Sequence, residues 1–170
     1  MSQEINEYDQ SRFTSLIARG LTQDRLKELL TYDSNTGEFH RRRTGKIAGW
    51  LEDGGYAKVY VEGHTYYAHV LAWFYIYGEW TMVDHADTIK ANNTLSNLRK
   101  ANRRQNSANQ GVRITNLLGV KGVQQRGNRF RAMITVNYRV IHLGTFDTIE
   151  KASEAYRQAA IRHSGDFANG

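Results

Sequence analysis

The chain has 170 residues, of which 40% are hydrophobic and 11% aromatic, so it can bury a core and is not a disordered polypeptide. It contains no cysteine and no proline, which excludes a disulfide framework, a cysteine-bound zinc site and a proline-rich linker. A formal net charge of +6 at pH 7 and a pI of about 9.6 favour a polyanionic partner such as nucleic acid.

The start of the chain predicts a short arm. Residues 1–20 are mixed and polar, and Phe13, Leu16 and Ile17 form a possible apolar helical face. No apolar run approaches the roughly 20 residues of a membrane helix. The first residues also lack a signal-peptide pattern. We therefore expect a cytoplasmic protein without a membrane partner.

A first helix is predicted after this arm. Thr22 is an expected N-cap, because threonine side chains accept hydrogen bonds from the first backbone N–H groups of a helix. Leu26, Leu29 and Leu30 then recur at helical intervals. The pattern predicts a helix that runs to about Tyr32.

Turn residues at 33–37 separate this helix from a short predicted strand at 38–40. Three consecutive arginines, Arg41, Arg42 and Arg43, follow directly. They form either a solvated charged strand edge or a set of phosphate contacts. Direct reading of bases is the less favoured role for them.

The next segment predicts a hairpin. Two alternating runs, 47–51 and 56–61, are separated by Gly54 and Gly55, and a third run follows at 65–68. Strands joined by such short glycine turns pair antiparallel. We expect the first two runs to form this hairpin.

Residues 68–77 are apolar and bulky, and their spacing predicts a buried helix. His69 lies near its start and is interpreted as a core histidine rather than a metal ligand. Trp73, Phe74 and Trp80 are interpreted as core aromatics.

The stretch 82–110 carries the candidate chemistry. An apolar approach ends in Asp84 and His85, an asparagine-rich loop with Asn97 follows, and a basic segment carries Asn106. Carboxylate and amide oxygens suit hard cations such as Mg²⁺, Mn²⁺ or Ca²⁺, and a neutral imidazole can accept a proton from water. Taken singly, each of these residues is more simply a loop, turn or helix-surface residue. Their joint spacing favours a hydrolytic site.

This stretch resembles the HNH nucleases in the asparagine-ended version of phage and intron-borne homing endonucleases. The family core is two strands and a helix around one divalent ion. The layout from Leu21 to Asn109 resembles that class as a whole. The residues that carry the resemblance are Val83-Asp84-His85, Asn93, Ser96-Asn97-Leu98-Arg99, Gln105-Asn106 and Asn109.

The resemblance implies a role for each matching residue. Asp84 and Asn106 would bind Mg²⁺ or Mn²⁺, and His85 would be the general base. Asn97 would hold the loop and orient the base. The implied reaction is hydrolysis of phosphodiester bonds in DNA.

Three positions depart from the family pattern. Thr88 and Asn92 stand where many members have a glycine and an aspartate, so the loop is the less predictable part. Asn102 replaces a threonine and is interpreted as a helix N-cap. In a nuclease, phosphate contacts are expected from the basic clusters, namely Arg41, Arg42, Arg43, Arg99, Arg103 and Arg104.

The second half of the chain has a different pattern. Residues 129–136 alternate between a basic or polar face and an apolar face, which predicts a strand. A second strand is expected at 139–143 after a turn at Asn137-Tyr138. A helix then follows, capped by Thr148 or Asp147. Three strands backed by one helix is the natural assembly.

This half resembles the Apetala-type domain of plant ethylene-response factors, which also occurs fused to phage HNH nucleases. The carrying residues are Gly122-Val123, Phe130-Arg131-Ala132, His142-Leu143-Gly144-Thr145-Phe146, Glu154-Ala155-Tyr156 and Ala159-Ala160. In that family the sheet lies in the major groove. The positions implied to face DNA are Gln124, Arg126, Arg129, Arg131, Thr135 and His142.

One departure indicates a different DNA target. The tryptophan that many plant members carry after the first strand is absent, and Gly127-Asn128 occupies that turn. The alternative to a DNA-reading surface is a small sheet with a solvated basic face.

Together these patterns predict an α+β protein, with an HNH ββα-metal nuclease core followed by a small three-stranded antiparallel sheet packed on one helix. The expected divisions are an arm at 1–20, a nuclease domain at 21–110, a linker at 111–118 and a DNA-binding domain at 119–170. The expected function is a homing-type DNA endonuclease.

The expected substrate is double-stranded DNA, bound by a monomer without a small-molecule cofactor. The expected source is a phage, acting in the host cell. Two alternatives stay open. One is a non-catalytic DNA-binding regulator on the same scaffold, and the other is a protein that binds or cleaves RNA.

Overall fold

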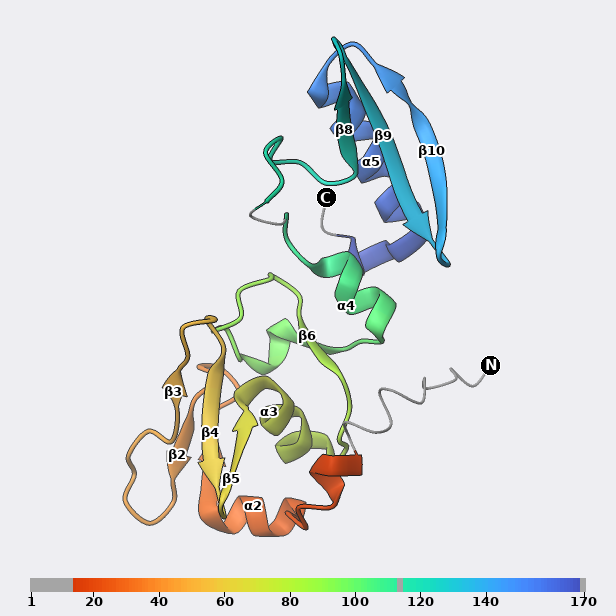
Figure 1. Ribbon diagram of the computed structural model, residues 1–170. Coiled ribbons are helices and arrows are strands. Elements are labelled where there is room, and N and C mark those ends of the chain that lie inside the picture. The colour runs from red at the N-terminus through yellow and green to blue at the C-terminus, as the bar shows by residue number, and fades with distance from the viewer. Residues whose placement is uncertain (1–13, 113–114, 169–170) are drawn as a thin grey trace. The chain divides into compact units, whose positions relative to one another are not determined.

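A computed structural model describes residues 14–112 and 115–168 (Figure 1). The chain forms two compact units that divide between Arg103 and Arg104. The sequence predicts the boundary after residue 110. The difference concerns the helix α4 (Arg103–Asn109). This helix groups with the second unit, where the Lys121 ammonium donates to the Ala108 carbonyl at 2.9 Å.

The first unit has short strands around two helices. Its strands pair antiparallel as β1–β2, β3–β4–β5 and β6–β7. Before them, residues 14–17 are helical. Phe13, predicted on the apolar face of the arm, lies outside the described residues. The elements are α2 (Gln23–Leu29), β1 (Leu30–Tyr32), β2 (Phe39–Arg41), β3 (Trp50–Leu51), β4 (Ala57–Val61), β5 (His64–Tyr67), α3 (Ala68–Tyr77), β6 (Val83–His85), the 3₁₀ turn η1 (Leu95–Asn97) and β7 (Leu98–Lys100).

The predicted N-cap of α2 is confirmed, because the Thr22 hydroxyl accepts a hydrogen bond from the Arg25 backbone N–H at 3.1 Å. The predicted end of this helix is wrong. The backbone becomes extended at Leu30, with φ −128° and ψ 156°, and continues as β1 to Tyr32. Adjacent leucines are compatible with either structure, and pairing with β2 decides in favour of the strand.

The core of the first unit surrounds α3, which spans the residues predicted for it. Leu71 and Ala72 are fully buried, and Phe74 stacks on Trp80 with ring centroids 3.8 Å apart. His69 is buried, as expected for a core histidine. Trp73 and Trp80 are only partly buried and pack against this core.

The β4–β5 hairpin presents one apolar face to this core. Val59 and Val61 are buried, and the strands are joined by a two-residue turn at Glu62-Gly63 with φ values of 44° and 82°. Positive φ at both positions matches the twist of a tight hairpin. The hairpin predicted from runs 47–51 and 56–61 corresponds to the antiparallel β3–β4 pair, in which β3 is reduced to Trp50 and Leu51.

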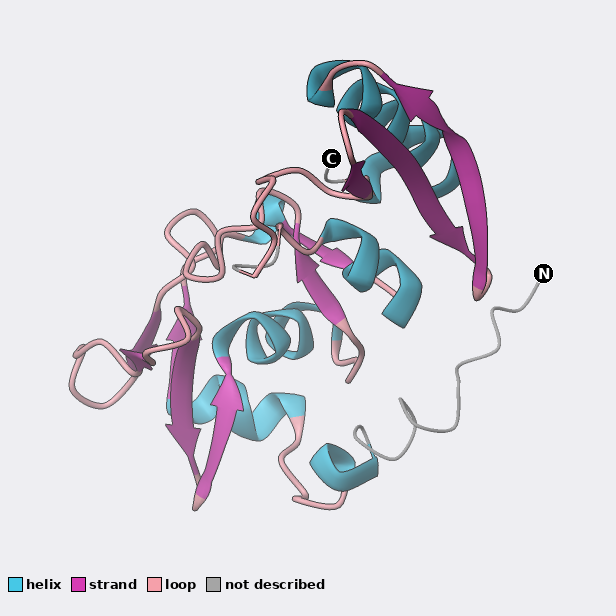
Figure 2. Cartoon of the chain, turned by 45° about the horizontal axis from the view of Figure 1, so that its top comes forward, coloured by secondary structure: helices cyan, strands magenta, loops and turns pink. Residues whose placement is uncertain are grey.

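The second unit is a three-stranded antiparallel sheet in the order β10-β9-β8, with a helix along one face (Figure 2). No helix in the described parts of the chain is long and apolar enough to span a membrane. The elements are α4 (Arg103–Asn109), β8 (Val123–Arg126), β9 (Arg129–Val136), β10 (Arg139–Phe146), α5 (Ile149–Ser164) and the 3₁₀ turn η2 (Gly165–Phe167).

Small side chains allow α5 to approach the sheet closely. Ala132 of β9 packs with Ala152, and Ile134 packs with Ala159 and Ala160. Of the two candidate caps, Thr148 is the N-cap of α5, and its hydroxyl accepts from the Lys151 N–H at 3.3 Å. β10 extends beyond residue 143, the predicted end of this strand. The mixed helix and antiparallel-sheet architecture confirms the predicted α+β class.

Candidate functional site

The predicted base and metal ligand lie side by side on β6, a three-residue strand that is buried throughout. Cross-strand pairing with β7 sets Asp84 opposite Arg99 and His85 opposite Leu98. β6 ends at His85. The chain then turns into the asparagine-rich loop 86–94, as the sequence predicts.

Asp84 forms an ion pair with Arg99. The Arg99 Nη2 and Nε atoms lie 3.1 and 3.2 Å from the same carboxylate oxygen, Oδ2. The two side chains are 8% and 20% exposed, so the pair is largely removed from water. A buried carboxylate needs such a counter-charge, because desolvation penalises an isolated ion. The arginine predicted as a phosphate contact thus neutralises the predicted metal ligand.

His85 is buried among ring systems and one amide. Its Nε2 lies 3.1 Å from the Asn93 Oδ1. The His69 ring meets it edge-on at a centroid distance of 4.8 Å, and the Tyr56 ring lies 6.2 Å away. These contacts hold the imidazole plane from several sides.

Asn97 ties the loop closed. Its Oδ1 accepts from the Asp87 backbone N–H at 3.0 Å, and its Nδ2 donates to the Asp87 carboxylate at 2.9 Å and the Asn92 carbonyl at 2.8 Å. The Asp87 pKa reflects this network. Partial burial acts to raise it, but hydrogen bonds from Asn92, the Ile89 N–H and Asn97 lower it overall.

The loop also contains a strained residue. Thr88 has a φ of 64°, in the left-handed region that disfavours β-branched side chains. It is one of the two departures from the family pattern in this loop, at a position where many members have glycine. The hydrogen bonds that Asn92 and Asn97 make to Asp87 hold this conformation in place.

Asn106, the second predicted metal ligand, lies on α4 and belongs to the second unit, so its pairing with Asp84 at one cation stays a prediction. Within the described residues, no group of three or more His, Cys, Asp or Glu side chains is arranged to hold a metal. The predicted donors are instead one carboxylate and one amide oxygen. Such a set suits a hard cation that keeps several water ligands.

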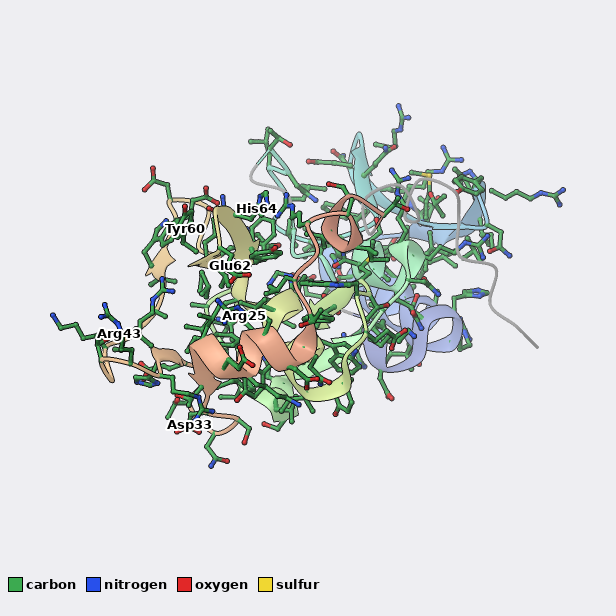
Figure 3. The ribbon with its side chains drawn as sticks, turned by 90° about the horizontal axis from the view of Figure 1, so that it is seen from below. Arg25, Asp33, Arg43, Tyr60, Glu62 and His64 are labelled. Atoms are coloured by element: carbon green, nitrogen blue, oxygen red, sulfur yellow. The ribbon has the colours of Figure 1, made fainter. Side chains whose placement is uncertain are left out.

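The other basic side chains differ in their surroundings. Arg41 donates to the Tyr60 carbonyl and Arg42 to the Lys27 carbonyl, both at 2.9 Å, so both brace the unit. Arg43 is exposed and extends away from the ribbon (Figure 3). Arg103 and Arg104 are exposed at the start of α4.

The face of the β8–β9–β10 sheet opposite α5, here called the open face, carries the side chains predicted to contact DNA. Pairing sets Gln124 beside Arg131 and Arg126 beside Arg129. The Arg131 Nε donates to the His142 Nδ1 at 2.8 Å. By strand alternation and register, the open face contains Gln124, Arg126, Arg129, Arg131, Met133, Thr135, Val140, His142 and Thr145.

Several residues of the open face and of the loop beside His85 were not identified from the sequence. Met133 and Val140 lie on the open face opposite His142 and Thr135, and the alternation of β9 already indicates the side for Met133. Asp87 and Asn93 have no role in the sequence prediction, although Asn93 is among the residues that carry the resemblance. Their partners come from the fold of the loop, which local pattern does not specify.

Comparison with known proteins finds a match to the stretch that contains Asp84, His85 and Asn106. Residues 66–108 match the family model described as HNH endonuclease. The chain is 36% identical over 86 residues to an uncharacterized HNH endonuclease of Acanthamoeba polyphaga mimivirus. That match covers 51% of this chain and 44% of the viral protein, so the chain spans less than half of this relative's length. Residues 66–108 are therefore similar to an HNH endonuclease domain.

Proposed function

We propose that the protein is a homing-type DNA endonuclease that hydrolyses phosphodiester bonds with one divalent metal ion and a histidine base. The observation that carries this proposal is the placement of Asp84 and His85 at the end of a buried strand, beside a loop closed by Asn97, within the segment that matches the family. The homing type and a phage source rest on the resemblance alone.

The hydrogen bond to Asn93 defines what His85 does in this mechanism. An amide oxygen only accepts, so the imidazole donates its Nε2–H to Asn93 Oδ1 and keeps its lone pair on Nδ1. Nδ1 would then take the proton of the attacking water as a new phosphorus–oxygen bond forms. The bond to the leaving sugar oxygen breaks in the same displacement.

Asp84 and Asn106 would hold the metal, Mg²⁺ or Mn²⁺. Bound there, such an ion would supply Lewis-acid stabilisation of the charge that develops on the phosphoryl and leaving oxygens. Asp84 fits this role because it presents an oxygen ligand on a rigid buried strand. Arg99 would hold the carboxylate in place and offset part of its charge.

The open face would direct the enzyme to duplex DNA. Arg126, Arg129 and Arg131 gather toward the β8–β9 turn, where guanidinium groups suit guanine edges and phosphates. Met133 and Val140 lie toward the β9–β10 turn, and apolar side chains there suit the methyl group of thymine. The exposed side chains of Arg43, Arg103 and Arg104 would add phosphate contacts.

Conversion of supercoiled plasmid to open-circle or linear DNA with Mg²⁺ tests the nuclease. Wild type should cut, and chelation or His85→Ala should abolish cutting. His64→Ala is the matched control, because His64 is exposed at the β4–β5 turn. Cutting by His85→Ala at the wild-type rate would overturn the role of His85.

Binding to labelled duplex over a range of salt concentrations tests the open face. Alanine at Arg126, Arg129 and Arg131 should weaken binding and reduce the salt slope by about 0.9 for each phosphate that is no longer neutralised. Alanine at Arg157, Arg162 and Lys151 of α5 removes the same charge from the helix instead. Equal weakening in both triple variants would show that binding depends on net charge and not on the open face. Stronger binding to single-stranded RNA than to duplex DNA would favour an RNA partner.

A second candidate, a non-catalytic DNA-binding regulator, is favoured by one observation. The buried Asp84 carboxylate is already neutralised by Arg99, so the fold does not require a cation there. Tight duplex binding without cleavage under Mg²⁺ or Mn²⁺ would establish this candidate and overturn the nuclease.

A further inference from the structure

Resting on the proposed nuclease function, we propose that Asn93 is the residue that positions His85, and that Tyr32 and Gly37, distant in sequence, brace Asn93 from behind. The family resemblance implies that Asn97 has the orienting role. The geometry gives the two asparagines different roles: Asn97 closes the loop, and Asn93 holds the imidazole of His85.

The contact between Asn93 and His85 is buried and oriented. Both residues are almost fully removed from solvent, at 4% and 5% exposure. The Asn93 Nδ2 donates to the Ala91 carbonyl at 3.0 Å, which needs a donor and therefore turns Oδ1 toward the imidazole. The amide thus selects the tautomer with hydrogen on Nε2.

The contacts of Asn97 lie elsewhere. Its three hydrogen bonds engage the Asp87 backbone, the Asp87 carboxylate and the Asn92 carbonyl, and they use both the oxygen and the nitrogen of its amide. These bonds close the loop from its far end. Loss of Asn97 would loosen the loop while leaving the acceptor of His85 in place.

The segment that contains Tyr32 and Ser34 holds the backbone around Asn93 in place. The Tyr32 hydroxyl donates to the Asn93 carbonyl at 2.6 Å across 61 positions of sequence. Burial of the ring raises the pKa of Tyr32 to about 12, so this hydroxyl keeps its proton at ordinary pH. The Leu95 N–H donates to the Ser34 carbonyl at 2.9 Å, which joins the same two segments.

Gly37 completes the brace by close approach. A Cβ at this position would lie 2.4 Å from the Asn93 carbonyl carbon and 2.6 Å from the Thr94 nitrogen. Its φ of 76° also disfavours any other residue. Both neighbours are backbone atoms, so a side chain here must displace the peptide that carries Asn93.

The test reads the tautomer of His85 directly, by ¹⁵N NMR of the imidazole nitrogens in the full-length protein at one pH where the ring is neutral. His85→Ala assigns the signals. Wild type should show hydrogen on Nε2. Asn93→Ala should give a mixture of tautomers, whereas Asn97→Ala and the exposed control Asn35→Ala should keep the wild-type form.

Two further variants keep the test decisive if Asn93→Ala does not fold. Asn93→Asp retains an acceptor for Nε2–H and should preserve the tautomer. Tyr32→Phe removes only the hydroxyl and should shift the His85 signals without abolishing the fold. Wild-type His85 signals in folded Asn93→Ala, or a mixture of tautomers in Asn93→Asp, would overturn the proposal. Unchanged signals in Tyr32→Phe would overturn the brace.

Kinetics give the second readout. Asn93→Ala should lower kcat by about 10- to 100-fold, a fraction of the usual contribution of a general base, with KM changed less than about twofold. An increase in KM alone would contradict a positioning role. If wild type never cuts DNA, the nuclease proposal fails, while the NMR result still decides what holds His85.

Discussion

Arg99 neutralises Asp84, so removing its charge should destabilise the protein and make its stability depend on divalent cations. Arg99→Met keeps an unbranched apolar side chain and leaves the 8% exposed Asp84 carboxylate without its counter-charge. Breaking a fully buried pair costs about 3–5 kcal/mol. Because Arg99 is 20% exposed, we expect the free energy of unfolding to fall by about 2–3 kcal/mol.

Thermal unfolding measures this destabilisation. For a unit of this size, 1 kcal/mol corresponds to roughly 4–8 °C, so Arg99→Met should lower Tm by about 10 °C or more. Lys100→Met is the matched control on the same strand, because Lys100 pairs with Glu79 in an exposed contact, and such pairs contribute roughly 0–1 kcal/mol. Its Tm should change by only a few degrees.

Added Mg²⁺ or Mn²⁺ supplies the decisive comparison. If Asp84 binds the cation, the ion replaces the missing counter-charge and should raise the Tm of Arg99→Met more than that of wild type. Asp84→Asn in the Arg99→Met background should remove this gain. Equal cation effects on wild type and Arg99→Met, or unchanged stability in Arg99→Met, would refute the reasoning.

Three further predictions concern stability. Thr88→Gly should raise the unfolding free energy by about 1 kcal/mol by relieving the φ of 64°, and a lower Tm would contradict the strain. The Asp87 pKa is lowered in the folded state, so the ionised carboxylate stabilises the fold above its unfolded pKa, and this stabilisation is lost as pH falls through its folded pKa. In Asp87→Asn the unfolding free energy should therefore fall less at acid pH, as measured by urea unfolding across pH. Gly122→Ala should destabilise the second unit by about 2–4 kcal/mol, since its Cβ would lie 2.0 Å from the Tyr156 ring at a φ of 64°, and chemical unfolding that matches wild type would show that the ring can move.

Several features follow from local chemistry and could be predicted. Thr22 caps α2 because its hydroxyl reaches the N–H of Arg25 within one turn. Residues 68–77 form α3 because their spacing and bulk suit a buried helix. The alternation of β9 separates an apolar face from a basic one before any partner strand is known.

Other features depended on partners distant in sequence. The three residues after Leu29 form β1 because β2 pairs with them. α4 groups with the second unit, where Lys121 binds its Ala108 carbonyl. Arg41 and Arg42, predicted as phosphate contacts, each donate one side-chain hydrogen bond to a backbone carbonyl that is distant in sequence.

The sequence by itself determined which chemistry is available, because the residue types and spacing of Asp84, His85 and Asn97 are local properties of one loop and its flanks. Tertiary structure alone decided how those groups are held. Register places Arg99 on Asp84, and the Tyr32 hydroxyl reaches the Asn93 peptide across 61 positions of sequence, with Gly37 packed against the same peptide. Burial, charge compensation and the choice of tautomer arise only when these distant groups meet.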